Sequence, residues 1–257
     1  MEDLTEMATE RPDPAPDAAQ ALARDGAAGR SAPEKPRPPS FRVGENWLPM
    51  TRGLAYFSVP KVACTSIKMM MYELETGVPA RDDIAAGRMG VIHDAVKSLP
   101  YGQYVKRDLD GHATFAVVRD PVSRIESCYR DKVLGEKMMH LLLDREAFER
   151  LGLEERPSFA DFVARLEDYR AASGLIRHHS QPLPMFLGLK PAFFDALFGM
   201  HRLGELADWV SERVGGPVEI GHANRTERPA EGLAGPRERD EIERLYARDA
   251  VYSDWFA

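Results

Sequence analysis

From about residue 54 onward, short apolar runs alternate with amphipathic stretches along the chain. Residues 54–59 and 113–118 are short, apolar and rich in strand-forming side chains, as buried strands are. Residues 67–74 place their apolar side chains at helical spacing, one turn apart. Strands that alternate with helices are typical of βαβ units, whose sheets are largely parallel. We therefore predict a three-layer α/β fold with a central, mostly parallel sheet flanked by helices.

The strand over residues 113–118 leads into a second amphipathic helix. Asp120 suits the capping position before a helix, and Pro121 suits its first turn. We expect this helix to continue to about Lys132. Its predicted core face carries Val122, Ile125, Tyr129 and Val133, and its predicted polar face carries Asp120, Arg124, Ser127 and Asp131.

Later apolar stripes predict scaffold helices. One stripe runs over residues 203–214 and ends at Gly215, a common helix-terminating residue. Another begins at Ile242. The chain closes with aromatic side chains that we assign to the core, with base stacking as the alternative, namely Tyr252, Trp255 and Phe256.

The first 40 residues are of a different kind. They are rich in proline, alanine and charged residues and contain almost no large apolar side chains. Such a segment buries too little surface to offset the entropy of ordering it. We predict a disordered tail over residues 1–40, with a partner-binding role as the alternative, and a folded domain over residues 41–257.

Composition narrows the class of protein. With 257 residues, 44% of them hydrophobic, the chain suits one globular domain. The net charge of −7 disfavours a nucleic-acid partner, because phosphate backbones select basic surfaces. No apolar run approaches the roughly 20 residues of a membrane span, and the N-terminus lacks a signal-peptide pattern, so we predict a cytoplasmic location. Cys64 and Cys128 are too few for a disulfide framework and lack the spacing of a zinc site.

Candidate chemistry lies at the strand-to-helix junctions. After the first strand, Pro60 precedes Lys61, and a helix begins a few residues later. A helix N-terminus can bind anions, because its N–H groups are unpaired and carry partial positive charge. Thr65 and Ser66 can cap this helix or donate hydroxyls to an anion that the Lys61 ammonium also reaches. The glycine-rich pattern of nucleotide triphosphatases is missing, and an ordinary βα turn with a solvated lysine fits the same residues.

A second anion-binding candidate follows the strand over residues 113–118. Arg119 stands at the strand end and Ser127 on the polar face of the next helix. Together they can contact one phosphate, the arginine by a forked, charge-assisted contact and the serine by one hydroxyl bond. Taken singly, Arg119 also fits a local ion pair with Asp120, and Ser127 fits a solvated helix position.

Both junctions resemble motifs of one enzyme family. The run from Val59 to Lys68 resembles the 5′-phosphosulfate loop of the carbohydrate sulfotransferases related to the chondroitin and dermatan 4-O enzymes. The run from Phe115 to Lys132 resembles the 3′-phosphate motif of the same family. The composition suits the small soluble members that occur in bacteria. Weaker similarity continues through residues 158–163, 178–182, 224–226 and 245–249.

This resemblance implies a P-loop-like fold and a sulfuryl donor, 3′-phosphoadenosine 5′-phosphosulfate (PAPS). Lys61 would stabilise the oxygen that leaves the sulfuryl group. Arg119 and Ser127 would hold the 3′-phosphate. The resemblance favours a hydroxyl of a carbohydrate as the acceptor, with a small alcohol, a phenol or a lipid headgroup as the alternatives. The acceptor is thus a small molecule or a glycan, no metal is expected, and the oligomeric state is left open. The 5′-phosphate would be held by Ala63, Cys64, Thr65 and Ser66.

The acceptor hydroxyl must lose a proton as it attacks, and histidine is the natural base near neutral pH. Among the seven histidines, His93 lies between the two motifs, where relatives tend to carry a histidine. His178 and His179 lie in the weaker match. We rank these three first, although a packed or solvated histidine is the commoner case. The alternative functions are a P-loop-type kinase, disfavoured by the missing glycines, and a non-catalytic protein that binds PAPS or another nucleotide.

Overall fold

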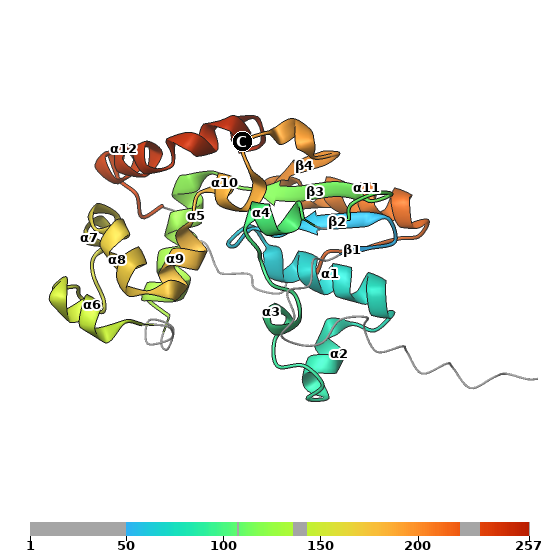
Figure 1. The fold of residues 1–257 in the computed structure, drawn as a ribbon, viewed down its shortest axis with the longest axis horizontal. Helices are drawn as coiled ribbons and strands as arrows, with labels where there is room; N and C mark the ends of the chain where they lie inside the picture. The colour runs from blue at the N-terminus through green and yellow to red at the C-terminus, as the bar shows by residue number, and fades with distance from the viewer. Residues whose placement is uncertain (1–49, 107, 136–142, 222–231, 257) are drawn as a thin grey trace, which may run out of the picture. The chain divides into compact units, whose positions relative to one another are not determined.

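The predicted tail over residues 1–40 and the predicted domain start at residue 41 lie outside the described part of the chain, so both stay predictions. The computed structural model describes residues 50–106, 108–135, 143–221 and 232–256 (Figure 1).

A four-stranded sheet lies at the core of these residues, in the order β1-β2-β3-β4 (Figure 1). Its strands are β1 (Met50–Thr51), β2 (Leu54–Phe57), β3 (Ala113–Val118) and β4 (Ala196–Gly199). The last three run parallel to one another, whereas β1 is antiparallel to β2. The prediction of a mostly parallel sheet is confirmed.

Helices make up most of the remaining described structure. A π-helical turn, η2 (Tyr129–Val133), follows α5, and a 3₁₀ segment, η5 (Ala247–Trp255), follows α12. In the part of the chain that the structure describes, no helix combines the length and the apolar character needed to cross a membrane. The α-helices are α1 (Cys64–Thr76), α2 (Ala80–Ala85), α3 (Ile92–Ala95), α4 (Tyr101–Tyr104), α5 (Pro121–Cys128), α6 (Arg145–Arg150), α7 (Phe159–Ala164), α8 (Leu166–Ala172), α9 (Gly174–Ser180), α10 (Leu183–Leu187), α11 (Leu203–Val214) and α12 (Pro236–Leu245).

Aromatic packing shows that helices cover both faces of the sheet. Tyr56 of β2 stacks on Phe115 of β3 with ring centroids 5.1 Å apart, and the Phe115 ring lies 5.4 Å from Trp209 of α11. Phe57, the next residue of β2, points to the opposite face, since side chains alternate along a strand. There its ring lies 4.5 Å from that of Tyr104 in α4. The sheet has a helix on each face, and the three-layer α/β prediction is confirmed.

Helix α1 forms as its apolar spacing predicts. Ile67, Met70 and Met71 are buried in the core, and Leu74 packs against it. The helix ends at Gly77, whose φ of 71° is a left-handed conformation that glycine adopts without strain. Burial of each large apolar side chain stabilises the fold by about 2 kcal/mol. This buried face therefore anchors the helix that follows the candidate anion loop.

Helix α5 begins as predicted and then takes an unexpected form. Asp120 caps it by accepting a hydrogen bond of 2.8 Å from the backbone N–H of Ser123. From Tyr129 the chain continues as the π-helical turn η2, and the backbone N–H of Leu134 donates to the carbonyl oxygen of Tyr129 at 3.0 Å. Apolar spacing at the α-helical period cannot predict a π turn, and such turns are frequent at functional sites.

Arg124 is predicted on the polar face of helix α5, away from its core face, but the structure buries it. Its side chain is fully buried, donates to Asp249 Oδ2 at 3.2 Å and donates to the carbonyl oxygen of Gln181 at 2.6 Å. A buried cation must be paired to offset its desolvation. The pairing carboxylate belongs to η5, 125 residues further along the chain, so no local pattern could indicate it.

The predicted scaffold near the C-terminus is confirmed in part. The stripe predicted to begin at Ile242 instead lies at the end of a helix, because α12 starts at Pro236 and ends at Leu245. Helix α11 ends at Gly215, which has φ 73°. Tyr252 is fully buried and its hydroxyl donates to the carbonyl oxygen of Leu187 at 3.0 Å. Trp255 and Phe256 are partly buried against the same core, so these aromatic side chains belong to the core as predicted.

Candidate active site

The carboxyl ends of β2 and β3 lie at the same edge of the sheet, because the two strands are adjacent and parallel. Strand β2 leads into the loop that carries Lys61, and strand β3 leads into Arg119. Arg119 Nη1 donates to the carbonyl oxygen of Lys61 at 3.4 Å, across 58 residues of sequence. The structure therefore brings the two predicted motifs together.

The loop before α1 has a strained backbone. Lys61 has φ 68° and Ala63 has φ 62°, and neither residue is glycine. A left-handed conformation costs such a residue roughly 1–2 kcal/mol, and this strain clusters at ligand sites. Turns of this kind point successive N–H groups into an anion-binding concavity. Because α1 begins at Cys64, Ala63 takes the N-cap position without a side-chain bond, and the predicted cap by Thr65 or Ser66 is wrong.

Lys61 and Lys132 share one carboxylate. Asp131 Oδ2 lies 2.6 Å from Lys61 Nζ and 3.0 Å from Lys132 Nζ. Desolvation alone would raise the pKa of Asp131, but the two ammonium groups outweigh it and lower that pKa. The charged carboxylate belongs to η2, and its ion pair holds the ammonium group of Lys61 in place at the loop. No local pattern indicates this contact of Asp131, because its partner Lys61 lies 70 residues earlier.

A lysine that sequence analysis did not single out also lies near the loop. Lys68 of α1 is 1% exposed, its Nζ donates to Ser98 Oγ at 3.2 Å, and the same nitrogen lies 3.1 Å from His93 Nδ1. Ser98 Oγ is 2.8 Å from Ser58 Oγ, just after β2. Desolvation lowers the pKa of Lys68 to about 8. Nothing in the local sequence distinguishes this lysine from a solvated one.

His93 lies between Lys68 and the first turn of α1. Its Nε2 is 3.0 Å from Thr65 Oγ1. Desolvation, followed by the positive charges of Lys68 and Lys132, lowers the pKa of His93 well below its usual value, although the ring keeps an exposed edge. The imidazole is therefore neutral near pH 7. The structure brings His93 to the anion loop, and its role as base stays a prediction.

The last turn of α9 carries His178 and His179. His179 Nδ1 lies 2.9 Å from the carbonyl oxygen of Leu175, which can only accept, so Nδ1 carries the proton and Nε2 the lone pair. The two imidazole centroids are 5.1 Å apart. Desolvation lowers the pKa of both rings, and the charge of Lys132 lowers it further. Both histidines thus lie within electrostatic reach of the lysine cluster.

Buried hydrogen bonds hold the end of α9 in place. Arg170 Nε donates to Ser180 Oγ at 2.9 Å, and its Nη2 donates to Tyr246 Oη at 2.5 Å. Asp249 Oδ1 accepts from the backbone N–H of Leu183 at 2.9 Å. Segments near the C-terminus therefore position the α9 histidines.

The structure tests the remaining predicted site residues less directly. Arg119 and Ser127 are both half-buried, and their joint binding of a phosphate stays a prediction. His140, His222 and residues 224–226 lie outside the described part of the chain. Within the ranges that the structure describes, no three His, Cys, Asp or Glu side chains are grouped so that they could hold a metal ion.

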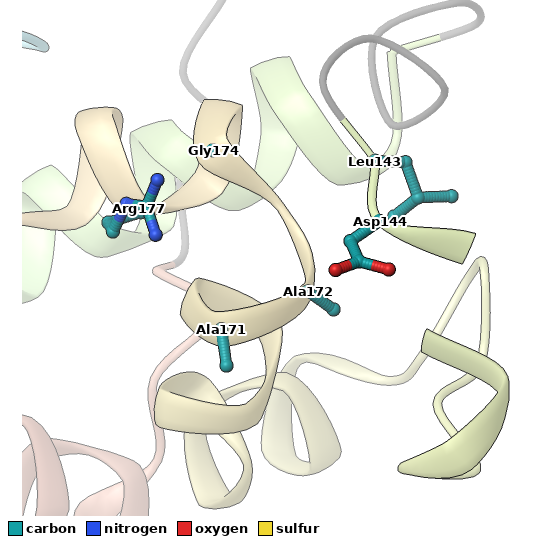
Figure 2. A pocket seen from close by; sticks show the side chains of 6 residues that line it. All are labelled: Leu143, Asp144, Ala171, Ala172, Gly174 and Arg177. Atoms are coloured by element: carbon teal, nitrogen blue, oxygen red, sulfur yellow. The ribbon is translucent and has the colours of Figure 1, made fainter. Parts of the chain in front are cut away.

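Two hollows open beside α9. One, of about 310 Å³, is lined in part by His178 and Gln181. The other, of about 520 Å³, has Asp144 and Arg177 on its wall (Figure 2). Gly174 and Arg177 line both hollows, so the two adjoin at the start of α9.

Comparison with protein-family models matches residues 48–250 to the sulfotransferase family. The match covers well over half of the chain and contains both strand-to-helix junctions. The chain belongs to the sulfotransferase family. No curated protein and no solved structure matches it. The cluster around Lys61 and Arg119 is accordingly the candidate active site of this sulfotransferase.

Proposed function

We propose that this sulfotransferase moves a sulfuryl group from PAPS to a hydroxyl of a small molecule or a glycan. The observation that carries the proposal is the convergence of the Lys61 loop and Arg119 at the carboxyl edge of the sheet. The buried ammonium groups of Lys68 and Lys132 lie close by, in a chain whose net charge is −7. Local positive charge in an acidic protein favours a polyanionic ligand, and PAPS carries two phosphate groups and a sulfuryl group.

The two motifs would bind opposite ends of the donor. The backbone N–H groups from Ala63 to Ser66 would hold the 5′-phosphate at the start of α1. Arg119 would make a forked contact with the 3′-phosphate, and Ser127 would add one hydroxyl bond. ATP and adenylyl sulfate lack a 3′-phosphate, so this contact would select PAPS over both.

Lys61 would stabilise the leaving oxygen. Sulfuryl transfer, like phosphoryl transfer, passes through a loose in-line transition state, and charge grows on the bridging oxygen that stays with adenosine 3′,5′-bisphosphate. Lys61 Nζ is 2.6 Å from Asp131 Oδ2, which supports a fixed position for the ammonium group beside the loop. A charge that is already in place stabilises the transition state without reorganisation.

His179 is our first choice for the base, with His178 second. Donation from His179 Nδ1 to the carbonyl oxygen of Leu175 leaves the Nε2 lone pair to accept a proton. The acceptor O–H bond would lose its proton to Nε2 as the new O–S bond forms and the bond to the bridging oxygen breaks. The hollow lined by His178 would hold the acceptor next to this ring, whose centroid is 5.1 Å from that of His179.

A cytoplasmic location is part of the same proposal. Cys64 and Cys128 are both buried, and neither forms a disulfide. Free thiols are typical of proteins in reducing compartments, where disulfides are rare.

Transfer itself is tested by incubation of the protein with a cell extract and PAPS labelled on sulfur. A labelled product whose formation requires the protein supports the proposal. A thermal-shift panel tests the donor, since a ligand that binds only the folded state stabilises it. PAPS and adenosine 3′,5′-bisphosphate should raise Tm, whereas ATP and GTP should not. Phosphate transfer from ATP would favour a kinase, and PAPS binding without transfer to any acceptor would favour a non-catalytic binding protein.

The 3′-phosphate assignment has a separate test. Arg119→Ala should weaken PAPS binding by about tenfold or more, because a charge-assisted contact is lost. Binding of adenylyl sulfate should change far less. Arg81→Ala removes an exposed arginine of α2 and is the matched control that should change neither affinity. Equal losses for the two ligands in Arg119→Ala would place this arginine elsewhere.

A further inference from the structure

We propose that Lys68 and His93 are positioning residues that turn the hydroxyl of Thr65 so that it donates its hydrogen to the 5′-phosphate of the donor. This inference rests on the proposed function. It assigns a role to a buried lysine outside the predicted site, and it gives His93 a role other than that of base.

The direction of each hydrogen bond follows from the ammonium group of Lys68. A lysine ammonium has donors only, so His93 Nδ1, 3.1 Å from Lys68 Nζ, must accept. A neutral imidazole that accepts at Nδ1 carries its proton on Nε2. This Nε2–H is 3.0 Å from Thr65 Oγ1 and donates to that oxygen. Because the Thr65 hydroxyl accepts from His93, it donates its own hydrogen to a different acceptor.

Regular structure and buried contacts hold this relay. Thr65 and Lys68 are three residues apart in α1, at neighbouring positions of one helix surface. Lys68 is 1% exposed and also donates to Ser98 Oγ at 3.2 Å. Ser98, having accepted from Lys68, can donate to Ser58 Oγ at 2.8 Å. Lys68 therefore has acceptors on two sides, which keep its Nζ directed at His93.

The place of Thr65 indicates which acceptor its hydroxyl serves. Thr65 lies in the first turn of the 13-residue helix α1, directly after the strained loop that contains Lys61 and Ala63. An anion at this position accepts from backbone N–H groups. A hydroxyl whose hydrogen is not given to His93 can donate it to the anion as a charge-assisted hydrogen bond. With the other tautomer of His93, Nε2 would accept the Thr65 hydrogen, and the hydroxyl would present only lone pairs to the phosphate.

The same geometry separates His93 from the base. Its Nδ1 faces Lys68 and its Nε2 carries the proton, so the ring offers no lone pair to an acceptor hydroxyl. His179 has the opposite arrangement, with the proton on Nδ1 and the lone pair on Nε2. The two rings would thus serve different substrates, His93 the donor and His179 the acceptor.

Nitrogen-15 NMR of the imidazole rings tests the relay without any ligand, because the two tautomers have distinct nitrogen shifts. We expect His93 to carry its proton on Nε2, with His93→Phe identifying the signal. In Lys68→Met this single tautomer should be lost, while Lys97→Met, which removes an exposed lysine, should leave it unchanged. A proton on Nδ1 of His93 in the wild type would overturn the inference.

Calorimetric binding of adenosine 3′,5′-bisphosphate tests the link to the phosphate. Thr65→Val and Lys68→Met should each weaken binding about tenfold, whereas Thr65→Ser, which keeps the hydroxyl, should restore most of the affinity. If Lys68 acts through Thr65, the double variant should bind no more weakly than Thr65→Val alone. Additive losses, or full affinity in Thr65→Val, would overturn the inference. If the wild type bound no bisphosphate, the proposed function and the phosphate contact would fail together, and the NMR result would still show whether the relay exists.

Discussion

Replacing Lys68 with methionine removes a buried charge while it keeps the length of the side chain. Lys68 is 1% exposed, and desolvation lowers its pKa from 10.5 to about 8. This shift means that keeping the ammonium group charged destabilises the folded state by about 3 kcal/mol. Methionine leaves Ser98 Oγ and His93 Nδ1 without that donor, which costs about 1 kcal/mol each. At pH 7 we therefore expect the free energy of unfolding of Lys68→Met to exceed that of the wild type by about 1 kcal/mol.

The pH dependence gives a sharper test. The pKa of Lys68 is lower in the folded than in the unfolded chain, so the folded protein loses this proton first, as the pH rises through about 8. From there to about pH 10.5 the unfolded state binds more protons, and the stability of the wild type rises with pH. Between pH 7 and pH 9.5, titration of Lys68 should raise the free energy of unfolding of the wild type by about 2 kcal/mol. Lys68→Met lacks this group, so its free energy of unfolding should not gain this increase. The order of stability of the two proteins should therefore reverse.

Urea denaturation monitored by circular dichroism measures the difference in free energy of unfolding between Lys68→Met and the wild type at pH 7 and at pH 9.5. Titration of all other groups cancels to first order when the variant is compared with the wild type at the same pH. Lys97→Met is the matched control. Because Lys97 is exposed, the free energy of unfolding of this variant should stay within about 0.5 kcal/mol of that of the wild type. A loss of about 2 kcal/mol or more in Lys68→Met at pH 7, or a difference that is the same at both pH values, would refute the reasoning.

Three further experiments test the remaining roles. Lys61→Ala should lower kcat about 100-fold or more while PAPS affinity falls less, because the leaving oxygen gains its charge in the transition state. Equal effects on kcat and affinity would contradict this role. His179→Ala should lower kcat about 100-fold with PAPS binding intact and remove the acidic limb of the pH–rate profile, whereas near wild-type kcat in both this variant and His178→Ala would move the base elsewhere. Activity should survive EDTA, and complete loss restored by magnesium would favour phosphoryl transfer instead.

Local patterns in the sequence determined the elements that carry the candidate site. The apolar run over residues 113–118 forms β3 at those positions, and Asp120 caps α5 as predicted. The helical spacing after residue 67 forms the buried face of α1. These signals act between residues within a turn or two of one another, so the sequence alone contains them. The meeting of Lys61 and Arg119 depends on the adjacency of β2 and β3, because adjacent parallel strands end at one edge of a sheet.

Only the tertiary structure decided which polar side chains are buried and which partners they have. Arg124 pairs with Asp249, 125 residues later, and Lys61 with Asp131, 70 residues later. The burial of Lys68 results from the packing of α1 against residues from other parts of the chain. Desolvation and charge pairing depend on every atom packed around a group, and no local pattern contains that information. The sequence therefore indicated the segments that form the candidate site, whereas the fold decided the protonation states and hydrogen-bond directions within it.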